Sequence, residues 1–242
     1  EQDKLDVYNP KMFKALLDGS KSAVECTAVA NACNLMSLEK GLSFPPAQMD
    51  DLPTVLRPKS EGGMLERKVV VETVSSLYED GTQVPNDIRN GVWVCIEGGT
   101  EYVRCCFQEY AVQIDPRSRY SVIFRRWHLI GLEVGISVAS AAIRGEATGS
   151  AVCFNADVAA RAKKDLVVGE MLDGEGGYTV YGIIQPAEKS VKEGFLPLGL
   201  ASNMKLIRPV AKGSFVTWAD VNYDKTTLAY KTRRETEAMF FS

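Results

Sequence analysis

The chain has 242 residues, 45% of them apolar and 24% charged, which is typical of a globular protein with room for two domains. Its net charge of −3 gives no basic footprint for nucleic acid. No apolar run is long enough to span a bilayer, and the charged residues at the start of the sequence do not resemble a secretory signal.

Six cysteines occur, at positions 26, 33, 95, 105, 106 and 153. None forms a C-x-x-C pair, and none lies at zinc-finger spacing from the single histidine, His128. Several fall in apolar patterns, where reduced cysteines pack as small hydrophobic residues. Because reduced cysteines are typical of the cytosol, the sequence predicts a cytoplasmic protein.

Two helices are predicted near the start of the chain. Asn9 is a good N-cap and Pro10 suits the first helical position, and apolar residues then recur at helical spacing. A second helix, rich in small residues, is predicted from about Ser20 to Cys33. Lys21 and Glu25 lie four residues apart on one face of it. They are either a solvated ion pair or two functional groups near the helix start.

A β-rich section follows an irregular, proline-rich crossing at residues 41–58. We expect a strand to begin at residues 69–71. Further strands are predicted at residues 92–96, 101–112 and 121–124, because β-branched and aromatic residues dominate there between turn sequences. Consecutive strands joined by short loops predict an antiparallel meander.

A long apolar helix is predicted after the last of these strands. Apolar residues from Leu129 to Ile143 fall all round the helix, which is typical of a buried helix, here covering the sheet. Arg126 and His128 precede it and Glu133 lies inside it, so a polar site is one interpretation. The alternative is that His128 caps the helix and that Glu133 pairs with Arg125 or Arg126.

The last third of the chain has short segments with frequent glycines, and no long helix is predicted there. Segments beginning at Leu166 and Val210 repeat one pattern at a constant offset, and each predicts a strand, a tight turn and a strand. The tail Lys231–Glu237 is expected to be a surface segment. We therefore predict an α+β fold, with an antiparallel or mixed sheet covered by helices in residues 1–150 and a small all-β domain in residues 151–242.

The sequence lacks the glycine-rich turns of common nucleotide sites. No G-x-G-x-x-G follows a strand, and no G-x-x-x-x-G-K-[ST] occurs. One histidine excludes a histidine-rich metal site, whereas a carboxylate site for Mg²⁺ or Mn²⁺ stays open.

Two parts of the chain resemble known families. Residues 162–221, with two glycine-centred hairpins and a closing T-W-x-D-V, resemble the SAF domain, a small β-clip module. The segments N-P-K-M-F at 9–13, L-D-G-S-K-S-A-V-E at 17–25 and W-H-L-I-G-L-E at 127–133 resemble SAF-domain oxidoreductases of the homoserine dehydrogenase-like superfamily. That superfamily includes the 1-deoxy-D-xylulose 5-phosphate reductoisomerase-like proteins. The resemblance implies an NAD- or NADP-binding Rossmann domain that is missing from this sequence, so we expect the catalytic and SAF part of a longer enzyme.

The resemblance also implies roles for individual residues. Lys21 would be the general acid or base, or would polarise a substrate carbonyl, and its place near a helix N-terminus would ease proton donation. Asp18 and Glu25 would orient Lys21 or hold a divalent metal. Phosphate or hydroxyl groups would be held by Asn9, Lys14, Arg126 and His128, with Ser20 and Glu133 as further substrate contacts.

Two other functions stay open. One is a non-enzymatic carbohydrate-binding or oligomerisation module, and the other is an aldolase or dehydratase with Lys21 as a Schiff-base nucleophile. The small-residue helix from Leu129 and the open antiparallel sheet would suit the interface of a homodimer, so a homo-oligomer is expected. The expected partners are a small-molecule substrate and further copies of the chain, without nucleic acid or membrane.

Overall fold

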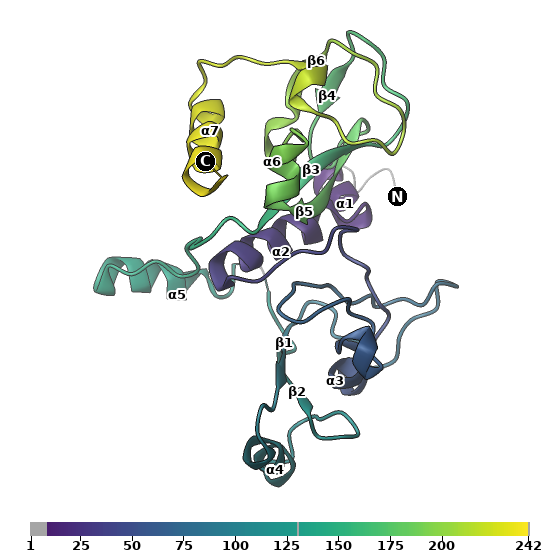
Figure 1. The fold of residues 1–242 in the computed structure, drawn as a ribbon, viewed down its shortest axis with the longest axis vertical. Coiled ribbons are helices and arrows are strands. Elements are labelled where there is room, and N and C mark those ends of the chain that lie inside the picture. The colour runs from purple at the N-terminus through teal and green to yellow at the C-terminus, as the bar shows by residue number, and fades with distance from the viewer. Residues whose placement is uncertain (1–8, 130, 242) are drawn as a thin grey trace. The chain divides into compact units, whose positions relative to one another are not determined.

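The computed structural model describes residues 9–129 and 131–241, which form two compact units (Figure 1). The first unit joins the residues up to Leu42 with Ala151–Ser242, and the second is Ser43–Ser150. This division differs from the expected one, because the first helices pack with the C-terminal part of the chain. Helices and antiparallel sheets occur together, as the α+β prediction requires.

The first two helices form where the sequence predicts them. α1 (Pro10–Leu17) starts after the N-cap Asn9, whose side-chain oxygen accepts a hydrogen bond from the Lys11 amide at 3.0 Å. α2 (Ser20–Cys33) starts after Gly19, whose φ of 82° is a left-handed conformation that glycine adopts without strain.

In the first unit, α2 packs against the antiparallel pair of β3 (Ala156–Ala162) and β5 (Val180–Pro186) (Figure 1). Ser20 is fully buried, and its hydroxyl accepts a hydrogen bond of 2.8 Å from the Gly182 amide. A Cβ at Gly182 would lie 2.6 Å from a methyl carbon of Leu198 and 2.7 Å from one of Val158, so a larger residue there would force these side chains to shift. These contacts tie α2 to the sheet.

The sequence repeat is also a structural repeat, because its two copies pair with each other. Leu166 and Val210 exchange backbone hydrogen bonds of 2.8 and 3.0 Å. Residues 166 and 210 are equivalent positions of the repeat, 44 residues apart. Gly169 and Gly213 have the same spacing and both have positive φ, 88° and 79°. Their amides make the matching bonds, to the Leu206 carbonyl at 2.8 Å and the Ala162 carbonyl at 2.9 Å. The two copies are therefore related by a local two-fold rotation axis, which is called the local two-fold below.

The remaining strands of the first unit form a three-stranded sheet in the order β4 (Met171–Asp173), β6 (Ser202–Leu206) and β7 (Val221–Asn222), and α6 (Ala187–Lys192) follows β5. The core of this unit gathers apolar side chains from both repeat copies, among them Leu166, Leu172, Val180, Leu196, Leu206, Val216 and Val221.

A further helix, α7 (Leu228–Phe241), corrects the prediction that the last third holds no long helix. Arg233 on α7 donates two hydrogen bonds to Asp157 of β3, at 2.9 and 2.6 Å, and a third to Glu237 at 2.6 Å. The side chains of Arg233 and Asp157 are only 11% and 8% exposed. The charged tail is thus held by a buried ion pair instead of forming a surface segment.

In the second unit, β1 (Val92–Glu97) and β2 (Tyr120–Arg125) form an antiparallel pair, which confirms the strands predicted at 92–96 and 121–124. The predicted strand at 101–112 is wrong, and with it the meander, because α4 (Glu101–Glu109) occupies that place. The Thr100 hydroxyl accepts a hydrogen bond from the Val103 amide at 3.3 Å and caps this helix.

The irregular crossing of the second unit contains the short helix α3 (Leu52–Val55). No strand begins at residues 69–71. The core of this unit is small and comes from the crossing, the segments after it and β2; its buried apolar members are Ala47, Met49, Leu52, Leu56, Leu65, Ile88 and Val122.

The buried helix expected from Leu129 to Ile143 is also wrong. α5 (Val134–Ala139) continues into a π-helical turn at Ser140–Arg144, and its apolar side chains are exposed in this chain. Ile136 is 64% exposed and Ile143 is 82% exposed. An all-round apolar pattern predicts burial only if another element covers the helix, and none of the described residues does. Residue 130, inside the expected helix, lies outside the described residues.

None of the six cysteines forms a disulfide bond, and Cys95 is expected to react much more slowly with thiol reagents than the exposed Cys33. Burial raises the pKa of the Cys95 thiol to about 11, assisted by the negative charge of Asp115. Only the thiolate reacts, so at pH 8 about one Cys95 thiol in a thousand is ionised, against roughly a quarter for a thiol of ordinary pKa. Alkylation at pH 8 with peptide mass analysis measures this, and equal labelling of both residues in the folded chain would contradict it.

Within the part of the chain that the structure describes, no helix has the length and apolar character needed to cross a membrane.

Candidate functional site

The predicted catalytic residues lie at the turn between α1 and α2. One carboxylate oxygen of Asp18 accepts a hydrogen bond from the Ser20 amide at 2.9 Å. The other lies 2.6 Å from the ammonium of Lys163, just beyond the end of β3. The side chains of Asp18 and Lys163 are 16% and 22% exposed, so this ion pair is largely shielded from water. Asp18 therefore contacts Lys163, and the structure does not pair it with Lys21.

Lys21 and Glu25 are brought together on the first turns of α2. The Lys21 ammonium lies 2.5 Å from a Glu25 carboxylate oxygen, and the two side chains are 33% and 63% exposed. The solvated ion pair is one of the two alternatives that the sequence left open, and both side chains remain accessible to solvent.

Asn9 and Ser20, both predicted substrate contacts, have structural roles in the described contacts. The Asn9 side chain caps α1, and the buried Ser20 hydroxyl binds the Gly182 amide. They fix the two ends of the helix–turn segment that carries Asp18, and Lys21 follows directly after Ser20.

A cavity with a volume of about 500 Å³ opens beside this turn. Lys14, Leu17 and Asp18 line it from the α1 side, and Lys163, Tyr181 and Lys212 line it from the strand side. The Lys14 ammonium lies 2.9 Å from the centre of the Tyr178 ring, a cation–π contact. Among the residues that line this cavity, Lys14 and Asp18 were predicted from the sequence as site residues. The sequence missed the three strand-side residues, because only the tertiary fold brings them to α1.

The second predicted group, around Glu133, lies in the other unit. Its carboxylate binds the Arg125 guanidinium and the His128 ring nitrogen Nδ1, each at 2.7 Å. The pairing of Glu133 with Arg125 is the structural alternative that the sequence left open. His128 does not cap the helix, because α5 begins only at Val134.

Arg126, the remaining predicted substrate contact, turns to other partners. Its guanidinium donates a hydrogen bond to the Asn86 side-chain oxygen at 3.2 Å and lies 5.4 Å from the Trp127 ring centre.

An ion-pair network that the sequence did not reveal surrounds Tyr120. Lys68 and Arg119 each contact both Glu61 and Glu97, at 2.6 to 3.2 Å. Partial desolvation acts to raise the pKa of Glu61, but hydrogen bonds from Lys68 and Tyr120 and the charge of Arg119 outweigh it and lower that pKa. The groups neutralise one another, so the arrangement serves structure better than proton transfer.

The described residues form neither a clustered metal site nor a sheet of the Rossmann type. No group of three or more His, Cys, Asp or Glu side chains gathers in residues 9–129 and 131–241 as a metal site would require. Asp18 and Glu25 are each paired with a lysine. All strand pairs within the named sheets are antiparallel, whereas a Rossmann domain needs parallel strands.

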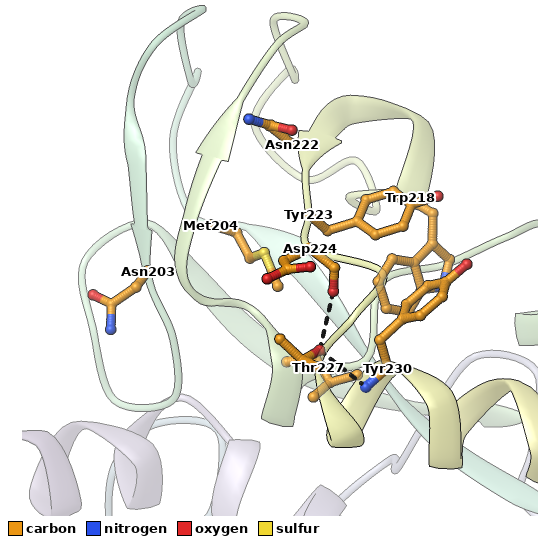
Figure 2. Close-up of a pocket in the computed structure, with 9 residues that line it drawn as sticks. Asn203, Met204, Trp218, Asn222, Tyr223, Asp224, Thr227 and Tyr230 are labelled. Carbon is orange, nitrogen blue, oxygen red and sulfur yellow. Dashed lines mark hydrogen bonds between the residues drawn. The ribbon is translucent and has the colours of Figure 1, made fainter.

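A second cavity of about 360 Å³ lies near the start of α7 (Figure 2). Trp218, Tyr223 and Tyr230 form one wall, with ring centres 5.0 to 5.4 Å apart. In Figure 2 these rings gather on one side, away from Asn203. Asp224 also lines the cavity, and hydrogen bonds from the Thr226 hydroxyl and amide hold the pKa of its carboxyl low.

No curated protein matches the chain. A family model described as "Oxidoreductase DRL, catalytic domain" matches residues 1–134, which is more than half of the 242 residues. Every site residue predicted from the sequence, from Asn9 to Glu133, falls inside this match. The chain therefore belongs to the family of the oxidoreductase DRL catalytic domain.

Proposed function

We propose that the chain is the catalytic and SAF-like part of an NAD(P)H-dependent oxidoreductase that reduces a small polyol-derived or sugar-phosphate-type carbonyl substrate. The observation that carries the proposal is Asp18, which lines a cavity with three lysines. Asp18 and the nearby Lys21 lie in the region matched to an oxidoreductase catalytic domain. Such a cavity supplies the convergent polar groups that a small-molecule site needs.

In the proposed reaction, Lys21 polarises the substrate carbonyl or donates the proton that its oxygen takes up. Glu25, 2.5 Å away, holds the ammonium on the exposed face of α2. Asp18 acts less directly, because its contacts are with Ser20 and Lys163. It fixes the turn and the cavity wall while Lys21 carries the chemistry.

The nicotinamide would supply the hydride. Since the named sheets of the described residues are antiparallel, we propose that a separate Rossmann domain holds the nicotinamide dinucleotide. We propose no metal-dependent step, because no group of three or more His, Cys, Asp or Glu side chains gathers in the described residues.

The SAF-like assignment rests on the local two-fold of the repeat. Two glycine turns with positive φ, at Gly169 and Gly213, pair reciprocally with the opposite copy, as two hairpins of a small β module would. The homoserine dehydrogenase-like assignment rests on the sequence segments alone.

The proposed enzyme is a cytoplasmic homo-oligomer. A two-stranded sheet is marginal by itself, and the β1–β2 pair exposes Val94 and Ile123, at 59% and 63%. α5 adds exposed apolar side chains, among them Ile136 and Val138. Apolar surface on this scale favours a second copy as cover. Light scattering gives the mass of the assembly, and a strictly monomeric protein would contradict the proposal.

The redox proposal is tested in the full polypeptide that carries this chain and its nucleotide-binding domain. We expect NADH or NADPH to be consumed with a phosphorylated ketose or aldose and not without substrate. Absence of consumption over a panel of such carbonyl compounds, in protein that binds the nucleotide, would refute it.

A carbohydrate-binding module is the second candidate, and the aromatic cavity of Figure 2 favours it. Aromatic rings on one side of the cavity, with the amides of Asn203 and Asn222 elsewhere in its lining, suit a neutral sugar. Saturable binding of a neutral monosaccharide at these residues, together with no nicotinamide turnover, would favour this candidate over the enzyme.

A further inference from the structure

We infer that the cavity beside Asp18 is a binding site for a phosphate monoester group, held by Lys14, Lys163 and Lys212. The inference rests on the proposed function, because it places the anionic part of the substrate. Among the described residues, three lysines and one aspartate line this cavity. The excess of positive charge inside a concave site favours an anionic ligand.

Each lysine keeps donors for a ligand. The Lys163 ammonium donates to the Gly177 carbonyl at 2.6 Å and faces Asp18 at 2.6 Å, which leaves one of its three N–H groups. For Lys14 and Lys212, no carboxylate of the described residues lies within 4.0 Å of the ammonium. Two of the three charges are therefore not neutralised by a carboxylate of the described chain.

The local backbone holds these groups in place. The Lys212 amide donates to the Asp165 carboxylate at 2.8 Å, which fixes the start of the Gly213 turn. The Lys11 ammonium donates to the Asp173 carbonyl at 3.0 Å, so α1 is tied to the end of β4. The site is thus formed before a ligand arrives.

The local two-fold shows that the fold does not require these lysines. Ile207 stands at the position equivalent to Lys163, and Val168 at the position equivalent to Lys212. These two apolar residues are 51% and 61% exposed. The same hairpin geometry therefore forms with apolar residues, whereas Lys163 and Lys212, one from each copy, lie together in the cavity that α1 borders.

The charge count favours phosphate over a carboxylate. Three ammonium groups less one carboxylate leave a net charge of about +2, which matches a phosphate monoester at neutral pH. A carboxylate carries a single negative charge and fewer acceptor positions. Lysine binds phosphate as a flexible point charge, so exact fork geometry is not needed.

The test is titration of the present chain at constant ionic strength, followed by calorimetry and by amide NMR. The probes are inorganic phosphate, glycerol 3-phosphate and, for the carboxylate alternative, acetate. We expect saturable binding of both phosphate compounds, with the largest shifts at Ala162, Lys212 and Gly213. Lys212→Val should weaken binding about tenfold, as expected for loss of one charge-assisted contact.

The matched control is Lys164→Val on the same unit. Lys164 is exposed and pairs with Glu170 at 2.6 Å, away from the cavity lining, so binding should stay within about twofold. Equal weakening by both variants, acetate binding as tight as phosphate, or no saturation by phosphate would each overturn the inference. No nicotinamide is present, so failure here leaves the redox proposal standing.

Discussion

Replacing Lys21 with alanine is expected to reduce turnover of the full enzyme by about 10²- to 10⁴-fold, the range that a positioned acid or base contributes. The fold should stay intact, because Lys21 makes only an exposed pair with Glu25, four residues along α2. Such pairs contribute about 0.3–0.5 kcal/mol. The measurement is the steady-state rate of nicotinamide oxidation, with circular dichroism as the check on folding.

Two further variants sharpen this result. Lys21→Arg keeps the positive charge but transfers protons poorly. Partial activity would assign Lys21 to polarising the carbonyl, and complete loss would assign it to proton donation. Lys164→Ala removes another lysine that has a carboxylate partner and should leave the rate unchanged. Normal turnover by Lys21→Ala would exclude Lys21 from the chemistry.

Replacing Arg233 with alanine is expected to destabilise the first unit by about 3–5 kcal/mol, because it leaves the buried Asp157 carboxylate without its partner. Asp157 is 8% exposed and keeps only two uncharged donors, the Ser190 hydroxyl at 2.6 Å and the Val158 amide at 3.0 Å. Glu237, 9% exposed, would lose one of its two arginines. α7 should then detach from β3.

Hydrogen exchange of the β3 and β5 amides measures this loss, because it reports on the first unit separately from the second. Lys231→Ala, an exposed change on the same helix, should alter protection by no more than about 0.5 kcal/mol. Replacing Arg233 and Asp157 together with leucine should recover much of the loss, since a buried apolar pair avoids the desolvation of two charges. Unchanged protection in Arg233→Ala would mean that α7 does not depend on this ion pair.

Local chemistry made some elements predictable. Asn9 and Pro10 mark the start of α1, and the composition of residues 92–96 marks β1, because caps and strand propensities act over a few residues. The same rules were available for α4, whose cap Thr100 is visible in the sequence. The β-branched and aromatic residues of 101–112 outweighed that signal and gave the wrong element.

Other features depend on the tertiary fold and have no local signal. The exposure of α5 depends on what covers it, which its apolar pattern does not state. Lys163 and Lys212 join Lys14 only because the repeat folds back on itself beside α1. Of the residues that line the cavity beside Asp18, the sequence therefore singled out Lys14 and Asp18 on the α1 side, and none on the opposite wall.

The most direct test of the account is hydride transfer itself. The full polypeptide is incubated with a nicotinamide deuterated at the transferable position and a phosphorylated carbonyl substrate, and the product is analysed by mass spectrometry. The account predicts one deuterium on the carbon that was the carbonyl, and a rate that falls strongly in Lys21→Ala. Product without deuterium, or bound substrate that never reacts, would contradict it.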